Sequence, residues 1–185
     1  MTTTLELAFT PESLAKRPAC GLDVETTLAH FAIVTYGVDP AALRAHIHPR
    51  FELATFRMAD GDRRGLLSVV PFMDLDFRFV RFPWISWSFG QTNYRAYVRD
   101  TETGEHVAWF FGTALDSLSV SVPRYVWKLP WHRAAIRFDC DFDERSGRYR
   151  HFRMQTQSKW APAQLELTDT GELPTDLVGF DDLET

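Results

Sequence analysis

The feature that most constrains this chain is a plan that occurs three times: an alternating segment, a short polar loop and a second alternating segment. In residues 134–142, apolar side chains at the even-numbered positions alternate with mostly charged ones. This period of two is typical of a half-buried β-strand. The loop at residues 143–147 and the segment 148–156 follow at once, so we expect a β-hairpin here.

The same plan surrounds two further loops, at residues 59–62 and 101–104. The segments 51–58 and 66–72 flank the first loop, and the segments 93–99 and 105–111 flank the second. Successive hairpins of this kind predict a meander of antiparallel strands.

Helices are few in this sequence. Asp39 is a good N-cap for a helix that begins at Pro40, because proline at the first helical position loses no useful N–H group. A second helix is expected from Asp116 toward residue 126, with a break or kink at Pro123. The fold class predicted is α+β, mainly β: a highly curved antiparallel sheet or partly closed barrel with a few short helices.

Length and composition favour one soluble domain over residues 1–185. The chain is 45% hydrophobic and has a formal net charge of -5, which is far from the composition of disordered chains. No apolar run approaches the ~18 residues of a membrane span, and the start lacks the plan of a signal peptide. We therefore expect a cytoplasmic protein with no membrane partner.

Several kinds of chemistry are missing from the sequence. It contains no dinucleotide or phosphate-binding glycine loop, no HExxH and no Gly-x-Ser-x-Gly elbow. His46 and His48 have no third metal ligand nearby, and Cys20 and Cys140 lie far apart, so we expect neither a metal nor another cofactor. Basic residues gather in the region 124–153, but residues 1–159 have a net charge of only +2, so we expect no nucleic-acid partner.

One segment, residues 124–134, places Arg124, Lys128 and His132 among large apolar rings at a predicted helix-to-strand junction. Its pattern resembles the acetoacetate decarboxylase-like superfamily, and more closely the YqjF-like family of uncharacterised bacterial proteins within it. The order and spacing of residues 30–49, 67–72, 93–98 and 110–117 extend this resemblance over most of the chain. The resemblance implies a single domain of that fold, and a homodimer, because related folds commonly assemble.

The resemblance also implies a test for catalysis. The decarboxylases use a lysine of lowered pKa that forms an imine with a keto acid. This lysine belongs to a pair of lysines that follows a Leu/Phe-Pro turn. In this chain Trp131 and His132 follow Pro130, so both lysines are absent. Lys128 lies a few residues too early, and Schiff-base decarboxylation is therefore not implied.

A ligand pocket is still expected. Alternate residues of a strand share a face, so Asn93, Arg95 and Tyr97 form one row, in which Arg95 suits a carboxylate. The alternative is that Tyr94, Ala96 and Val98 face the core and this row faces water.

The residues around Pro130 have their own alternatives. Trp131 is expected to line the pocket, and Arg124 either orients a ligand or neutralises a helix end. His132 either acts as an acid or base in the same pocket as Arg95, or caps an aromatic cluster.

Two functions follow from these alternatives. The first is a protein that binds a small, partly apolar organic ligand, for which a carboxylate is one candidate, in a β-barrel pocket. The second is an enzyme that acts on small keto acids or related carbonyl compounds through Lys128 or His132.

The end of the chain is acidic. The 26 residues from Trp160 onward contain seven acidic residues and no Lys or Arg. In the YqjF-like family, a stretch like residues 179–185 leads into a further helix and closing strands. Two interpretations stay open: a natural short form with a frayed end, or a chain that lacks a segment covering apolar surface.

Overall fold

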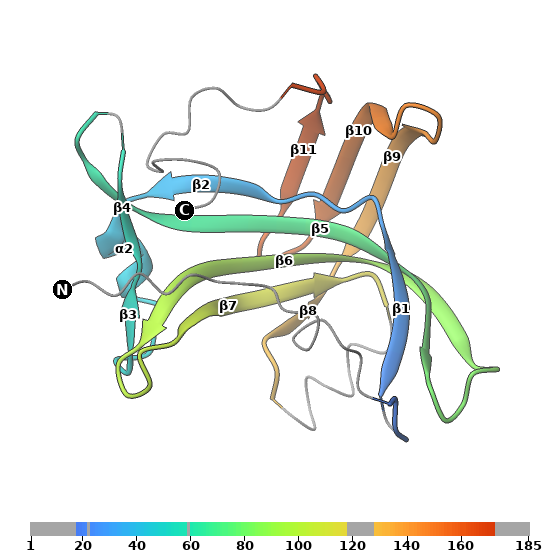
Figure 1. Ribbon diagram of the computed structural model, residues 1–185, viewed down its shortest axis with the longest axis horizontal. Helices are drawn as coiled ribbons and strands as arrows, with labels where there is room; N and C mark the ends of the chain where they lie inside the picture. Colours follow the sequence, from blue (N-terminus) through green and yellow to red (C-terminus); the bar gives the residue numbers. More distant parts are fainter. Residues whose placement is uncertain (1–17, 22, 59, 118–127, 173–185) are drawn as a thin grey trace.

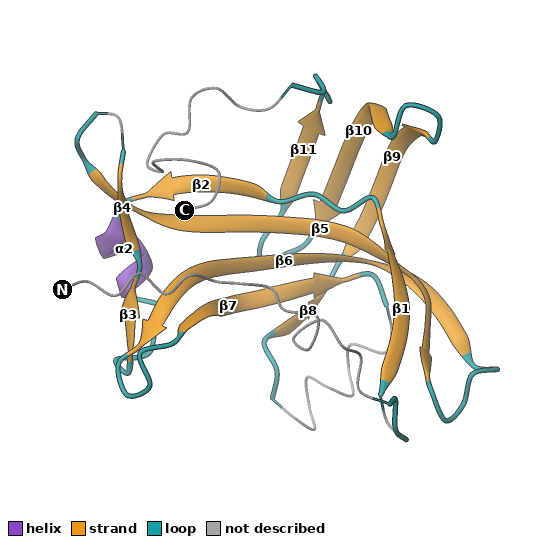
Figure 2. Cartoon of the chain, viewed as in Figure 1, coloured by secondary structure: helices purple, strands orange, loops and turns teal. Residues whose placement is uncertain are grey.

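The structure is a computed structural model that describes residues 18–21, 23–58, 60–117 and 128–172 (Figure 1). Most of the described chain is strand, and α2 (Pro40–Arg44) is a short helix at one end of the molecule (Figure 2). The strands are β1 (Val24–Ala29), β2 (Val34–Val38), β3 (Phe51–Leu53), β4 (Thr55–Arg57), β5 (Arg63–Phe79), β6 (Ser86–Asp100), β7 (His106–Leu115), β8 (Trp131–Arg133), β9 (Ala135–Asp143), β10 (Arg148–Gln157) and β11 (Ala163–Leu167).

The strands form a large sheet and a small one. The large sheet has the order β1-β5-β6-β7-β8, with β2 and β4 also paired to β5 and β3 paired to β6. The small sheet, in the order β11-β10-β9, runs across the direction of β5 and β6 (Figure 1). The path from β1 to β8 stays open in the described chain, so the predicted curved, mainly β fold is confirmed without a closed barrel.

The two longest strands, β5 and β6, give the large sheet its curvature. β1 pairs with residues 73–79 of β5, and β2 pairs with residues 65–69. Two different strands therefore lie along the same edge of β5. The ladder between β5 and β6 is interrupted by a bulge between Asp74 and Phe77, and the ladder between β6 and β7 by one beside Arg95. Bulges bend a strand and increase its twist, which accounts for the curvature.

The register of β6 separates its side chains onto two faces. We call the face that carries Tyr94, Ala96 and Val98 the core face, and the face that carries Asn93, Arg95 and Tyr97 the Arg95 face. On the core face the small sheet packs against the large one, and the central cluster consists of Val69, Tyr94, Ala114, Ala134 and Ile136.

Hydrogen bonds join the two sheets within this core. The hydroxyl groups of Thr92 and Thr156 lie 2.8 Å apart and are buried. The hydroxyl of Tyr94 donates to the carbonyl oxygen of Ala161 at 2.7 Å. Burial raises the pKa of Tyr94 to about 12, so this hydroxyl stays a donor over the physiological range.

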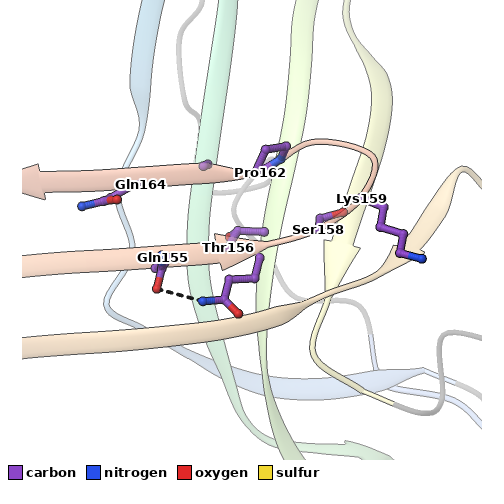
Figure 3. A pocket seen from close by; sticks show the side chains of 8 residues that line it. Gln155, Thr156, Ser158, Lys159, Pro162 and Gln164 are labelled. Atoms are coloured by element: carbon purple, nitrogen blue, oxygen red, sulfur yellow. Dashed lines mark hydrogen bonds between the residues drawn. The ribbon is translucent and has the colours of Figure 1, made fainter.

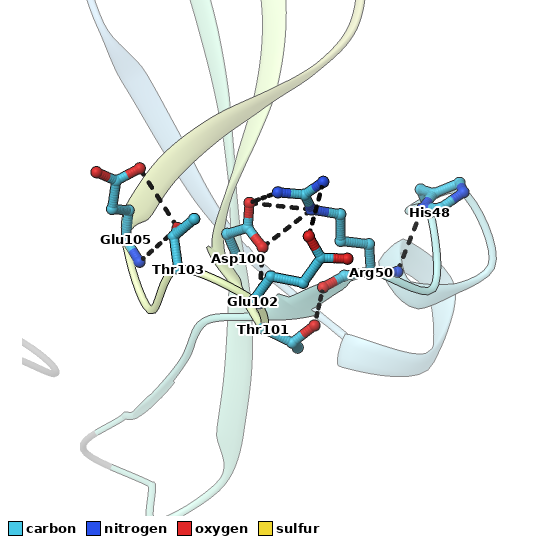
Figure 4. Close-up of polar contacts among 7 residues, drawn as sticks. All are labelled: His48, Arg50, Asp100, Thr101, Glu102, Thr103 and Glu105. Atoms are coloured by element: carbon cyan, nitrogen blue, oxygen red, sulfur yellow. Dashed lines mark hydrogen bonds and ion pairs between the residues drawn. The ribbon is translucent and has the colours of Figure 1, made fainter.

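An ion-pair network fixes the end of β6 beside α2 (Figure 4). The guanidinium of Arg50 donates to the buried carboxylate of Asp100, with Nη2 to Oδ2 at 2.6 Å, and to Glu102 Oε2 at 3.1 Å. Thr101 Oγ1 donates to the carbonyl oxygen of Arg50 at 2.6 Å. The turn that precedes β3 is thereby attached to the turn between β6 and β7.

Most predicted elements are present. The helix begins as predicted, with Asp39 Oδ1 accepting from the backbone N–H of Ala41 at 2.9 Å. The hairpins formed by β6 with β7 and by β9 with β10 match their predicted segments. The second predicted helix falls largely on residues 118–127, which lie outside the described residues.

Two features of the sheet differ from the prediction. The segment at residues 51–58 is not one strand: it divides into β3, which pairs with β6, and β4, which pairs with β5. The sheet is also mixed, because β8 pairs with β7 in parallel. The pairings of β3 with β6 and of β7 with β8 join segments that are far apart in the sequence, so local alternation does not determine them, whereas β4 and β5 are neighbours along the chain.

Candidate functional site

The predicted row of ligand-binding residues lies on the side of the large sheet away from the small sheet. Asn93, Arg95 and Tyr97 are all half-buried. The residues opposite them on β5 are almost fully covered, with Ser68 0% exposed beside Arg95 and Val70 2% exposed beside Asn93. Tyr94, Ala96 and Val98 do face the core, yet the row on the other face is not a plain solvent-exposed surface.

Arg95 is the unusual member of this row. Its Nε atom is buried and has no hydrogen-bond partner in the part of the chain that the structure describes, and its Cζ lies 5.6 Å from the ring centroid of Tyr97. Among the described residues, no carboxylate forms an ion pair with it. Leaving part of a guanidinium buried and unpaired costs free energy, which a bound anion would recover.

Asn93 presents hydrogen-bond donors to the same face. Its Oδ1 accepts from Gln91 Nε2 at 2.9 Å and from Thr113 Oγ1 at 2.7 Å. These two bonds occupy both lone pairs of the amide oxygen, so only the amide NH2 group is left to bind a further partner.

A chain of three hydroxyl groups lies next to Arg95. Ser68 Oγ is 2.8 Å from Thr35 Oγ1 and 2.9 Å from the hydroxyl oxygen of Tyr97. Three hydroxyl groups supply three protons, and the two bonds between them use two, so one O–H can donate to another acceptor. Arg95, Asn93 and this hydroxyl chain therefore all offer donors, which suits an acceptor-rich or anionic ligand.

An apolar pocket of about 600 Å³ adjoins the hydroxyl chain. It lies where β2, β4, β5, β6 and β7 meet, at the end of the large sheet nearest α2 (Figure 1). Its lining residues are Thr35, Gly37, Ala54, Phe56, Met58, Leu66, Tyr97, Val98, His106, Val107 and Ala108. Tyr97 thus belongs both to the pocket and to the surroundings of Arg95.

The other end of the Arg95 face is aromatic. Trp131 is opposite Thr113 in the ladder between β7 and β8, which places it on the same face as Asn93. It packs with Phe89 and Leu115, the centre of a cluster that also contains Phe77 and Trp87. Trp131 therefore lies on the face where the predicted row is found.

Asp74 lies at this aromatic end, opposite Phe89. It is 4% exposed, and its Oδ1 accepts from Thr26 Oγ1 at 3.1 Å, while Oδ2 has no partner among the described residues. Burial raises the pKa of this carboxyl group, and the hydrogen bond from Thr26 opposes the rise. The indole Nε1 of Trp87, in the same cluster, is likewise buried and finds no partner within the described ranges.

His132 does not join this group of residues. It is opposite Ala114, on the core face, and its ring stacks on Trp160 with centroids 4.2 Å apart and planes inclined by 6°. The prediction that Arg95 and His132 share a pocket is wrong, because neighbouring positions of β8 point to opposite faces of the sheet. The aromatic-cluster alternative describes the observed contact.

The other predicted site residues are less informative. Lys128 is exposed, with a φ of 54°, just before β8. Arg124 lies outside the described residues. His46 packs edge-on against Phe111, and His48 Nδ1 accepts from the backbone N–H of Arg50. Within the described ranges, no three metal-binding side chains come together.

The basic residues near the β9–β10 hairpin form ion pairs on the outer face of the small sheet. Arg153 pairs with Glu166 at 2.9 Å, and Arg150 pairs with Asp143 at 3.3 Å. The exposed strand positions therefore carry charges of both signs.

A further pocket lies at the turn between β10 and β11 (Figure 3). It has a volume of about 560 Å³ and is lined largely by polar side chains such as Gln155, Gln157, Ser158, Lys159 and Gln164. Gln157 Nε2 donates to Gln155 Oε1 at 3.3 Å across its rim. None of the buried polar atoms that lack partners in the described chain belongs to this pocket, so the Arg95 face is the better candidate.

Sequence reasoning missed four polar residues of the Arg95 face: Thr35, Ser68, Gln91 and Thr113. Ser68 carried a usable signal, since it is a polar residue inside the otherwise apolar segment 66–72. Gln91 lies two residues before Asn93 on β6, so alternation places it on the same face. Thr35 and Thr113 have no local signal, because only the strand register brings them to this face.

Comparison with known proteins gives a family and a fold. The DUF2071 family, described as an uncharacterised conserved protein, matches residues 25–179. No curated protein matches the chain. No helix of the described part of the chain has the length and apolar character needed to cross a membrane.

Solved structures that resemble this one include two enzymes. Acetoacetate decarboxylase from Legionella pneumophila subsp. pneumophila has a TM-score of 0.53 and 17% identity, covering 85% of this chain and 53% of that chain. The enduracididine biosynthesis enzyme MppR, in complex with pyruvate, has a TM-score of 0.54 and 17% identity, covering 75% and 54%. The chain thus spans about half the length of these structures, and the likeness shows an acetoacetate decarboxylase-like fold.

Proposed function

The chain belongs to the DUF2071 family of uncharacterised conserved proteins, and we propose that it binds a small, partly apolar organic acid on the Arg95 face. Arg95 holds the carboxylate, Asn93 and Tyr97 donate further hydrogen bonds, and Trp131 closes the aromatic end of the same face. The homodimer implied by the resemblance stays a prediction.

One observation carries this proposal. Arg95 is half-buried, its Nε is buried without a hydrogen-bond partner, and no carboxylate of the described chain pairs with it. Among the described residues, the Asn93 amide NH2 group and one O–H of the hydroxyl chain that ends at Tyr97 also have no acceptor. A carboxylate accepts from several donors at once and forms bidentate bonds with arginine.

The structural neighbours support an organic acid as the ligand class. One of them is a complex of MppR with pyruvate, so a fold of this type accommodates a small carboxylate in that protein. This chain has Trp131 and His132 in place of the lysine pair of the decarboxylases. Lys128 is exposed and His132 lies on the core face, so binding is favoured over an imine-forming reaction.

Calorimetric titration with butyrate and with its neutral amide, butyramide, tests the proposal. We expect butyrate to bind and butyramide to bind more weakly, since hydrogen bonds to charged groups contribute about 1.5–3 kcal/mol. Arg95→Met should weaken butyrate binding about ten-fold or more. Arg137→Met, an exposed arginine of β9, is the matched control. Equal binding of acid and amide, or equal losses in the two variants, would refute the proposal.

A further inference from the structure

We infer that the acid carries an apolar chain at least about 7 Å long, which fills the pocket beside Tyr97 while its carboxylate meets Arg95. This inference rests on the proposed function, because it specifies the orientation and the chemical class of the ligand at the same site. The class is an aliphatic or aryl-alkyl monocarboxylic acid.

The pocket and Arg95 share one face of the sheet. Thr35 is opposite Ser68 in the ladder between β2 and β5, and Ser68 is opposite Arg95 in the ladder between β5 and β6. Tyr97 is opposite Ala108, which lies in the pocket. Directly opposite residues in an antiparallel ladder project to the same side, so no strand separates Arg95 from the pocket.

The distance between Arg95 and the pocket sets a minimum length for the hydrocarbon chain of the ligand. Arg95 and Tyr97 are two residues apart on β6, which corresponds to about 7 Å along a strand. The guanidinium leans toward Tyr97, with Cζ 5.6 Å from the ring centroid. An acid whose carboxylate meets Arg95 therefore passes along the Tyr97 ring before its chain enters the pocket, and a two-carbon acid leaves the pocket empty.

The pocket lining determines what kind of chain fits. Phe56, Met58, Leu66 and Val107 supply apolar surface, and no acidic residue is among the described lining residues. An ammonium group would lose its hydration there without gaining a partner of opposite charge. The site should therefore prefer a plain monocarboxylate over an amino acid.

The volume of about 600 Å³ lies within the usual range for small-molecule sites, so a medium-length chain can be accommodated. Each buried methylene group contributes about 0.8 kcal/mol, which corresponds to an affinity gain of roughly four-fold. Affinity should consequently be clearly higher for octanoate, whose chain exceeds about 7 Å, than for acetate or butyrate, whose chains end before the pocket.

Ala108 allows the pocket to be blocked with little disturbance of the fold. It is exposed and lines the pocket opposite Tyr97, so Ala108→Phe places a ring where the chain of the ligand would lie. Ala135→Phe is the matched control, because Ala135 is an exposed alanine on β9. Calorimetric titration of both variants and of the parent protein with acetate, butyrate, octanoate and octanamide tests the inference.

We expect affinity to increase with chain length in the parent protein and in Ala135→Phe. In Ala108→Phe the octanoate affinity should fall about ten-fold or more, to that of butyrate. Equal affinities for acetate and octanoate, or unchanged octanoate binding in Ala108→Phe, would overturn the inference and leave the proposed function standing. Octanamide binding as tight as that of octanoate, or no binding of any acid, would overturn both.

Discussion

Arg95 and His132 lie on opposite faces of the large sheet, although both belong to the strands that surround β7. Arg95 is on the face that carries Asn93 and Tyr97, and His132 stacks on Trp160 on the core face. The two residues that the sequence suggested as partners in one pocket therefore have separate roles, which can be tested one at a time.

The first prediction concerns His132. His132→Ala should lower the free energy of unfolding by about 1 kcal/mol, because it removes an aromatic stack. Carboxylate binding should stay within about two-fold of the parent value, since the sheet separates the ring from Arg95. Urea unfolding and calorimetric titration on the same sample measure the two effects. A large loss of binding in a folded His132→Ala protein would assign His132 to the ligand site.

The second prediction concerns the pH dependence that Asp74 introduces. Burial raises the pKa of this carboxyl group above the ordinary value of 3.8, so the folded state holds its proton to a higher pH than the unfolded state does. Stability should fall as pH rises from 3.8 through the raised pKa, and then level off. Asp74→Asn removes this dependence, so its stability relative to the parent protein should increase over that window.

Urea unfolding at a series of pH values checks the Asp74 prediction. Thr26→Val is an informative companion, because it deletes the hydrogen bond that favours the ionised form and should make the pH dependence steeper. An Asp74→Asn variant that is less stable than the parent by the same amount at every pH would contradict the prediction.

The third prediction concerns the opposite pH dependence at Asp100. Its hydrogen bond with the Arg50 side chain, and then the backbone N–H of Glu102, lower the pKa of Asp100 below 3.8. The stability that this pair contributes is present above pH 3.8 and is lost as pH falls through the lowered pKa. Arg50→Met should reduce stability at neutral pH and make the remaining acid sensitivity smaller.

Unfolding midpoints at neutral and acidic pH measure the effect of Arg50→Met. Arg64→Met is the control, because within the described part of the chain Arg64 pairs with the exposed carboxylates of Asp60 and Asp62. Exposed pairs contribute little, so this variant should resemble the parent protein. If both variants show the same acid response, Asp100 is not the source of it.

The sequence predicts the hairpins well because the information for them is local. The alternation at residues 134–142 and the turn at 143–147 are sufficient to define β9 and the start of β10. The same is true of the helix cap at Asp39, whose side chain reaches a backbone group only two residues away. These features depend on neighbours in sequence, so a single chain reveals them.

The sidedness of β6 could not be predicted in this way. Asn93 and Arg95 make one face more polar than the Tyr94 face, yet this pattern does not tell whether the polar row lines a pocket or faces water. The small sheet packs on the Tyr94 side and thereby makes it the core face. This packing brings β6 into contact with residues 40 or more positions away in the sequence, such as Ile136. The alternation of β6 was enough to place Asn93, Arg95 and Tyr97 on one face, but their relation to His132 required the register of β8, and their role in ligand binding stays a prediction.

The last prediction uses the two tyrosines of β6 as a pair. Tyr94→Phe removes the donor to the buried carbonyl of Ala161, so it should lower stability by about 1 kcal/mol and leave carboxylate binding unchanged. Tyr97→Phe removes one end of the hydroxyl chain on the Arg95 face, so it should weaken carboxylate binding several-fold. Urea unfolding and calorimetric titration of both variants, with Tyr36→Phe as an exposed control, separate the two effects. If Tyr94→Phe weakened binding more than Tyr97→Phe did, the ligand would have to lie on the core face.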